Sequence, residues 1–162
     1  MKFDVMVPKN RIQEILSGYD PEEITIATLC SHTALQIFHG ARKEGFKTLG
    51  LAVNQNTKFY DAFPLARPDE ILRFNNYDEF VTKSKELTDR NVIIIPHGSF
   101  VEYMGTKRFE EMEVPTFGSR QVLKWEESRD SQREWLEGAG ISMPRRIADA
   151  RDIDEPVLVK YN

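Results

Sequence analysis

The sequence predicts an α/β fold with an open, mostly parallel sheet and helices on both faces. Segments rich in β-branched residues alternate with segments of helical periodicity, an order typical of such sheets. The segment 91–96 (NVIIIP) contains four consecutive branched aliphatic residues without polar alternation, which indicates a strand covered on both faces. A chain of 162 residues is also long enough to bury one substantial core.

The first half of the chain supplies two helices and two strands. Ile12, Ile15 and Leu16 recur at helical spacing and Gly18 follows them, which predicts a helix over 8–17. The β-branched residues of EITIATL and the apolar run KTLGLAV indicate strands. Between these strands, apolar residues on one face, basic residues in the last turn and a terminal glycine predict a helix. These three segments lie at 23–29, 47–53 and 33–44.

The second half continues the alternation. The polar, proline-punctuated segment 54–68 is expected to be a long loop, and EILRF a short strand. Helices are expected to follow, the last of which is long and laced with opposite charges such as Arg133 with Glu137 and Glu126 with Arg129, typical of a solvated face. The remaining elements are a strand at 70–74, a helix at 75–90, a short helical piece at 101–105, a strand-like segment at 114–118 and a helical region at 119–138.

The segment 156–161 (PVLVKY) is expected to be a strand that needs a hairpin partner. This predicts that the chain is the front part of a longer protein or an unusually short family member.

Composition excludes several classes. With 22 basic and 26 acidic residues the net charge is −4 and the pI about 5.5, which disfavours nucleic-acid and anionic-membrane partners. No apolar run approaches the roughly 18 residues of a membrane span. A single cysteine and an N-terminus without a signal-peptide core predict a cytoplasmic protein.

Polar residues follow two predicted strands, where open α/β sheets bind ligands. Cys30-Ser31-His32-Thr33 separates a strand from a helix, and His97-Gly98-Ser99 follows NVIIIP. Backbone N–H groups at the helix start can hold a phosphate, but a helix terminus contributes only about 0.3–1 kcal/mol, up to about 2 when partly buried. Side chains must add contacts, and His32 and Ser99 are the candidates.

Other interpretations of these residues stay open. Ser31 or Thr33 can simply cap the helix. Cys30 beside a histidine could be a nucleophile, although a small buried residue is the simpler interpretation. As zinc ligands, Cys30, His32 and His97 would form an incomplete set. His39 lies inside a helix, where a structural role is expected.

The sequence lacks the motifs of two common classes of nucleotide-binding protein. The turn after the first strand contains no G-x-G-x-x-G, which argues against a dinucleotide dehydrogenase. The sequence also lacks G-x-x-x-x-G-K-[ST], which argues against a phosphate-loop ATPase.

Four stretches match a known family in order and spacing. ITIATLCSHTALQIFHGARKEGF, VIIIPHGSFVEYMG, VPTFGSRQVLKWEESR, and GISMPRRI followed by VLVKY resemble the N-terminal part of the archaeal 5-formaminoimidazole-4-carboxamide ribonucleotide (FAICAR) synthetases. These are formate-dependent ligases of purine synthesis within the ATP-grasp superfamily. IATL-x-SHTAL and PHGSF are specific to this ligase, whereas the later stretch is shared more widely among ATP-grasp enzymes.

The resemblance implies a reaction and a set of site residues. In the family, ATP phosphorylates formate, and the amine of the imidazole carboxamide ribonucleotide AICAR attacks the formyl phosphate to give FAICAR, ADP and phosphate. The family's AICAR-binding histidine and serine fall on His32 and Ser99. Its ATP-binding region begins near Asp149 and includes the lysine of V-x-V-K, here Lys160. Cytoplasmic homo-oligomers are common in the family.

The resemblance also implies a domain organisation: a Rossmann-like pre-ATP-grasp domain for substrate at 1–118, a connecting helical region at 119–143 and the first strands of the ATP-grasp domain at 144–162. The family's glycine-rich nucleotide loop, catalytic residues and Mg²⁺ carboxylates would lie beyond Asn162, so no metal ligand and no activity are expected of this chain alone. Cys30 stands where the family pattern suggests glycine, which puts the approach of the ligand to this turn in doubt.

Two alternatives remain besides the formate–AICAR ligase. One is a related ATP-grasp ligase that uses a different acid or amine. The other is a non-catalytic nucleotide-binding module.

Overall fold

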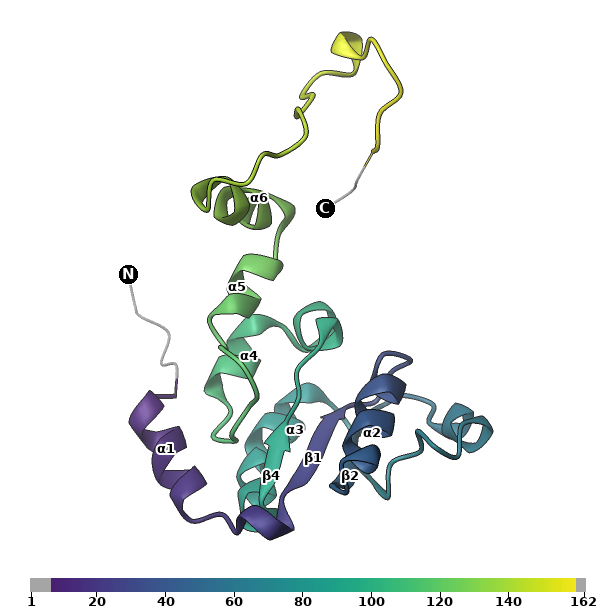
Figure 1. Ribbon diagram of the computed structural model, residues 1–162, viewed down its shortest axis with the longest axis vertical. Coiled ribbons are helices and arrows are strands. Elements are labelled where there is room, and N and C mark those ends of the chain that lie inside the picture. Colours follow the sequence, from purple (N-terminus) through teal and green to yellow (C-terminus); the bar gives the residue numbers. More distant parts are fainter. Residues whose placement is uncertain (1–6, 160–162) are drawn as a thin grey trace. The chain divides into compact units, whose positions relative to one another are not determined.

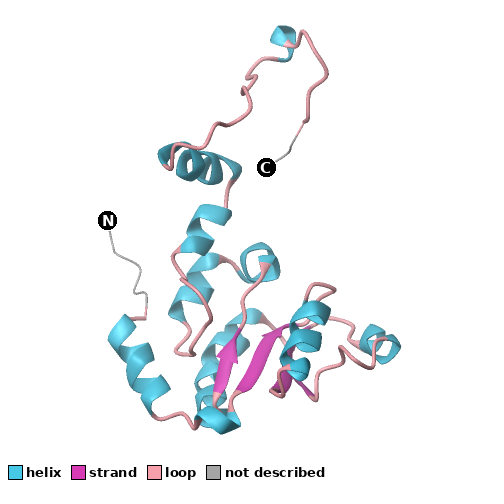
Figure 2. Ribbon diagram, in the orientation of Figure 1, coloured by secondary structure: helices cyan, strands magenta, loops and turns pink. Residues whose placement is uncertain are grey.

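The computed structural model describes residues 7–159. The chain forms two compact units, divided between Arg120 and Gln121. The first unit contains the sheet, and the second consists of two helices and a long irregular segment (Figure 2). Within residues 7–159, no helix is long and apolar enough to cross a bilayer.

The first unit is built on a four-stranded sheet in which all neighbouring strands are parallel. The strand order is β3-β2-β1-β4, so β1 and β2 occupy the centre. Their residues are almost all buried, as expected for parallel strands covered on both faces. The strands are β1 (Thr25–Leu29), β2 (Lys47–Val53), β3 (Glu70–Phe74) and β4 (Val92–Ile94).

Helices cover both faces of this sheet. The crossover through α2 leads from β1 to β2, and the crossover through α3 leads back from β3 to β4 on the other side of β1. In Figure 1, α2 lies in front of the sheet and α3 behind it, as expected for right-handed crossovers that run in opposite directions. The predicted fold class is confirmed. The helices of this unit are α1 (Lys9–Ser17), α2 (Ala34–Lys43), α3 (Tyr77–Lys83) and α4 (Thr106–Glu111).

The segment 91–96 differs from the expectation that it forms a doubly covered strand. Strand β4 has only three residues and is the end strand of the sheet order, with Val92 and Ile94 buried but Ile93 and Ile95 half-exposed. The strand-like segment 114–118 makes one parallel bridge, between Thr116 and Ile94. An apolar run without alternation therefore marked a buried segment but not its position in the sheet.

Two connecting segments are more ordered or less regular than expected. The loop 54–68 contains a 3₁₀ turn at Lys58–Ala62. The helix expected over 75–90 is α-helical only in α3 and continues as a 3₁₀ segment, Ser84–Arg90, which ends at Asn91 in the left-handed conformation (φ 52°). The α-helical part starts at Asn76, whose side chain accepts a hydrogen bond from the N–H of Glu79.

The side chain of Arg120 forms several hydrogen bonds at the C-terminal end of the first unit. Its guanidinium donates to the carbonyls of Phe109 (3.2 Å), Met112 (2.5 Å) and Val114, and its Nε lies 3.2 Å from Thr116 Oγ1. Burial of this charge lowers the pKa of Arg120 to about 10. One side chain thus satisfies several carbonyls of a segment that lacks regular pairing.

The second unit contains α5 (Val122–Glu126) and α6 (Arg129–Gly138) in place of one continuous helix. The break falls at Ser128, whose extended backbone and side chain cap α6 by accepting from the N–H of Ser131. It separates Glu126 from Arg129, whereas the expected pair of Arg133 and Glu137 forms within α6 at 2.7 Å.

The segment after α6 contains a single 3₁₀ turn, Ala150–Asp152, and no strand up to residue 159. The strand expected at 156–161 is thus absent over its described part, where Val157, Leu158 and Val159 are exposed; residues 160 and 161 lie outside the described part. A single extended segment is not stable as a strand unless a neighbouring strand accepts and donates its backbone hydrogen bonds.

Gly50, in the centre of β2, provides a test of the packing. A Cβ at this position would lie 2.9 Å from Cys30 Sγ, 3.2 Å from Pro68 Cγ and 3.3 Å from Ile71 Cγ1. We expect Gly50→Ala to lower the free energy of unfolding by about 1–3 kcal/mol through overpacking, measured by urea denaturation. Adding Cys30→Ala should restore part of this loss, since it removes the nearest atom.

Gly40→Ala is the matched control. Gly40 lies on α2 and an added Cβ would meet nothing within 4 Å. This variant should gain up to about 1 kcal/mol, because alanine has less backbone freedom to lose in a helix. Equal effects of the two substitutions would contradict the packing described around Cys30.

Candidate functional site

The strand order reverses between β1 and β4. From β1 the chain moves outward through β2 and β3, then returns to place β4 on the opposite side of β1. In open α/β sheets, ligands bind beyond the carboxyl ends of the strands at such a reversal. The two loops that flank it are residues 30–33, between β1 and α2, and residues 95–99, after β4. These are the loops that carry His32 and Ser99.

Hydrogen bonds tie the two loops together. Thr28 Oγ1 donates to the carbonyl of Ile95 at 2.7 Å, and the N–H of Ile95 donates to Ala27 at 2.8 Å. His97 then reaches across to β1, where its Nε2 lies 3.0 Å from the carbonyl oxygen of Leu29. The end of β4 is therefore fixed to the end of β1 by both backbone and side chains.

The hydrogen bonds of His97 define its tautomer. Nδ1 accepts from the N–H of Ser99 at 3.3 Å, and Nε2 must donate, because the Leu29 carbonyl can only accept. Burial lowers the pKa of His97, the bond to Leu29 opposes that shift, and the charge of His32 lowers it further.

The loop that carries His32 is held from two sides. Ser31 Oγ accepts from the N–H of Ala34 at 3.3 Å, so Ser31 supplies the expected cap, whereas Thr33 makes no side-chain capping bond. The hydroxyl of Tyr60 accepts from the N–H of Ser31 and donates to its carbonyl, both at 3.0 Å. His32 itself is exposed.

The second loop leads into a π-helical turn, Phe100–Met104. Ser99 is half-buried, and its N–H is oriented by His97. The ring of His97 packs edge-on against Phe100, with 5.6 Å between centroids. His32 and Ser99 thus belong to two loops that are joined at the reversal of the strand order.

Cys30 is part of the core. It is 2% exposed, and its N–H donates to the carbonyl of Leu51 at 2.8 Å, in continuation of the β1–β2 ladder. Burial raises the pKa of its thiol to about 11, against smaller opposing effects of Tyr60 and Arg73. A thiol with this pKa is not a nucleophile at neutral pH. Its φ is not positive, so the turn needs no glycine here.

The remaining candidates are His39 and the possible zinc ligands. His39 lies exposed on α2 and is not part of the core. No group of three or more His, Cys, Asp or Glu residues among 7–159 is arranged to hold a metal ion, and Cys30, His32 and His97 form no such set.

The candidate nucleotide residues lie apart from these loops in the chain. Asp149 belongs to the second unit, where it caps the turn Ala150–Asp152 and pairs with Arg151, a bond that lowers the pKa of Asp149. Lys160 lies outside the described residues.

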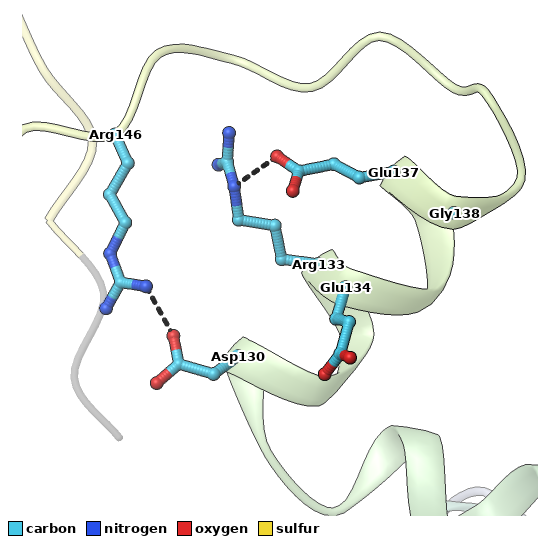
Figure 3. A pocket seen from close by; sticks show the side chains of 6 residues that line it. All are labelled: Asp130, Arg133, Glu134, Glu137, Gly138 and Arg146. Atoms are coloured by element: carbon cyan, nitrogen blue, oxygen red, sulfur yellow. Dashed lines mark hydrogen bonds and ion pairs between the residues drawn. The ribbon is translucent and has the colours of Figure 1, made fainter.

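The second unit also has an open hollow of about 510 Å³ beside α6 (Figure 3). Charged side chains line it, and ion pairs join Arg133 to Glu137 at 2.7 Å and Arg146 to Asp130 at 2.5 Å. Gly138 is the one lining residue without a charged side chain. The hollow is open to solvent and ion pairs occupy much of its lining, so it lacks the enclosure of a small-molecule site.

Sequence reasoning missed Tyr60 and the bridging role of His97. Phe59, Tyr60 and Phe63 are an unusual concentration of aromatic residues for a solvent-exposed loop, and this was the available signal. Tyr60 is in fact 1% exposed. The bond from His97 to Leu29 spans 68 positions and left no local signal.

The state of His97 predicts a pH dependence of stability. Because burial lowers its folded-state pKa below the ordinary value of about 6.5, the unfolded chain takes up this proton first as the pH falls. The stabilisation by neutral His97 is complete above pH 6.5 and is lost as the pH falls below it towards the folded-state pKa. In urea titrations between pH 8 and 5, the stability advantage of the wild type over His97→Gln should therefore shrink.

His39→Gln is the control for this titration, since it removes an exposed imidazole from α2. Its difference from the wild type should stay nearly constant with pH. A constant difference for His97→Gln as well would contradict the buried, neutral state of His97.

Comparisons with known proteins agree with the motifs. A family model described as "Protein of unknown function (DUF1246)" matches residues 26–147. The "5-formaminoimidazole-4-carboxamide-1-(beta)-D-ribofuranosyl 5'-monophosphate synthetase" of Methanosarcina acetivorans is 59% identical over 157 residues, 97% of this chain and 44% of the relative. A synthetase of the same name, numbered 1, from Methanosarcina mazei is 58% identical with the same coverage.

A solved structure is similar as well. The crystal structure of "an IMP biosynthesis protein PurP from Thermococcus kodakaraensis" superposes with a TM-score of 0.62 and 34% identity, over 80% of this chain and 41% of that chain. The chain spans less than half the length of the two curated relatives. The predicted resemblance to FAICAR synthetases is confirmed, and the match over residues 26–147 shows that the chain belongs to the DUF1246 family.

Proposed function

We propose that this chain is the AICAR-binding part of an ATP- and formate-dependent ligase of purine synthesis. The whole enzyme would convert AICAR, formate and ATP to FAICAR, ADP and phosphate. The names of the two Methanosarcina relatives and of the Thermococcus structure support this assignment. The remaining length of those relatives would carry the residues that bind formate and Mg²⁺ and that catalyse the transfer.

The observation that carries the proposal is the joining of two loops at the reversal of the strand order. His97 fixes the loop of Ser99 to the end of β1, and the loop of His32 follows directly from that same strand. A ligand beyond this edge would meet one imidazole and one hydroxyl from independent parts of the sequence.

These groups suit the substrate chemically. The imidazole carboxamide of AICAR offers donors and acceptors on a flat ring, and neutral His32 can supply one of each. Ser99 and the backbone N–H of Gly98 suit ribose or phosphate oxygens. The exposed position of His32 leaves its ring accessible to such a ligand.

The nucleotide side of the proposal rests on Asp149 and Lys160. A lysine near ATP phosphates acts as a point charge that stabilises the charge developing during transfer. In the described structure Asp149 is engaged by Arg151, so nucleotide contact would require exchange of this bond. We assign the Mg²⁺ ligands to the rest of the enzyme, as the resemblance to FAICAR synthetases implies. Homo-oligomer formation is part of the same proposal.

The first test is AICAR binding by isothermal titration calorimetry. His32→Ala leaves a polar group of the ligand unpaired, which costs about 1–3 kcal/mol and corresponds to roughly 5- to 150-fold weaker binding. His39→Ala is the matched control, because this histidine lies exposed on α2 and away from the loop. Equal losses for both variants would contradict a direct role of His32.

The second test is turnover of a chimera. Residues 1–162 would be joined to the remaining sequence of the Methanosarcina acetivorans relative, to which this chain is 59% identical. We expect ADP release that requires both formate and AICAR, measured by a coupled assay. ADP release that another acid or amine supports better would identify a related ligase instead, and no turnover with a folded chimera would contradict the assignment.

A further inference from the structure

Tyr60 makes an unusual contact with the backbone of the candidate site. It lies in the 3₁₀ turn Lys58–Ala62, which follows β2, and is almost completely buried. Its hydroxyl accepts from the N–H of Ser31 and donates to the carbonyl of Ser31, both at 3.0 Å. One side chain therefore satisfies both backbone polar groups of a single residue 29 positions away.

The position of this hydroxyl is determined by packing of the ring. Phe38 of α2 meets it edge-on with 5.8 Å between centroids, and Phe59 packs against it at 4.1 Å. Burial raises the pKa of Tyr60, so the hydroxyl keeps the proton that it donates to Ser31. A rigid ring thus presents a fixed donor and acceptor to the loop.

Ser31 is the residue directly before His32. Its N–H is held by Tyr60 alone, its carbonyl accepts from both the Tyr60 hydroxyl and the N–H of Ala34 (3.2 Å), and its Oγ accepts from the same N–H. The side chain of His32 is exposed, so packing around the imidazole does not fix its direction. Its position therefore depends on the backbone, which Tyr60 holds on the N-terminal side and the N–H of Leu35 holds on the C-terminal side by donating to the His32 carbonyl at 3.3 Å.

We propose that Tyr60 is a positioning residue that sets the direction of His32 through the backbone of Ser31. The role of His32 in binding AICAR is taken from the proposed function, whereas the ordering of residues 31–33 by Tyr60 stands independently of it. The cost of ordering this loop would then be met on folding and not on ligand binding.

The test is Tyr60→Phe, which keeps the ring and removes the hydroxyl. Loss of the two bonds should loosen residues 31–33 and weaken AICAR binding about three- to tenfold in calorimetric titrations, the range expected for one net hydrogen bond. Unchanged affinity, with AICAR bound normally by the wild type, would overturn the positioning of His32.

Tyr19→Phe is the matched control. The hydroxyl of Tyr19 donates to the carbonyl of Val92 at 2.9 Å, at the opposite, amino end of β4. Both variants should lower the melting temperature, because Tyr60→Phe removes two tyrosine-to-backbone bonds and Tyr19→Phe removes one. Only Tyr60→Phe should weaken AICAR binding. Equal weakening by both would indicate a general loss of stability and would overturn the proposal.

A double substitution separates action through His32 from direct contact. If Tyr60 acts through His32, adding Tyr60→Phe to His32→Ala should change AICAR affinity by less than twofold. Full additivity of the two losses would overturn the proposed route.

Amide hydrogen exchange without ligand gives a readout that does not depend on AICAR. The Ser31 amide should be protected in the wild type and exchange at least about threefold faster in Tyr60→Phe, while the Ile26 amide of β1 changes little. If the wild type bound no AICAR, the proposed function would fail and exchange alone would decide the ordering role of Tyr60. A Ser31 amide that exchanges in the wild type as in an unstructured peptide would overturn the proposal, even if Tyr60→Phe did not fold.

Discussion

The bond from His97 to the carbonyl of Leu29 joins the two halves of the first unit at the place where they diverge. Chain segments on the two sides of β1 come from different crossovers, and backbone pairing between β1 and β4 covers only three residue pairs. Beyond those pairs, Thr28 and His97 continue the connection by side chains. The neighbourhood of the two polar loops depends on this short contact, and so does every chemical role assigned to them.

Much of the first unit could be predicted because its signals are local. The boundaries of β2 and β3 coincide with the predicted segments, since an apolar run and its flanking turns lie within a few residues of each other. The positions of His32 and Ser99 at the ends of parallel strands followed from the same local order. The resemblance to FAICAR synthetases then led to a proposed substrate that periodicity could not name.

The features that escaped prediction depend on contacts that are distant in sequence. Strand β4 is the most apolar segment but lies at the end of the strand order, because position in a sheet depends on which strands pair. Ser128 is a residue type that commonly caps helices, which was a signal for the break between α5 and α6. The helical spacing of the residues on both sides of it favoured one continuous helix instead. Tyr60 had no local signal for its partner, since Ser31 lies 29 positions away.

The contact between Tyr60 and Ser31 also limits how the loop could be transplanted. Residues 30–33 alone do not contain the groups that fix their backbone, since one of these groups comes from the segment after β2. A protein engineer who moved only the loop to another parallel sheet would transfer the histidine without its support. The smallest portable unit is therefore β1, α2 and β2 together with the aromatic turn Lys58–Ala62.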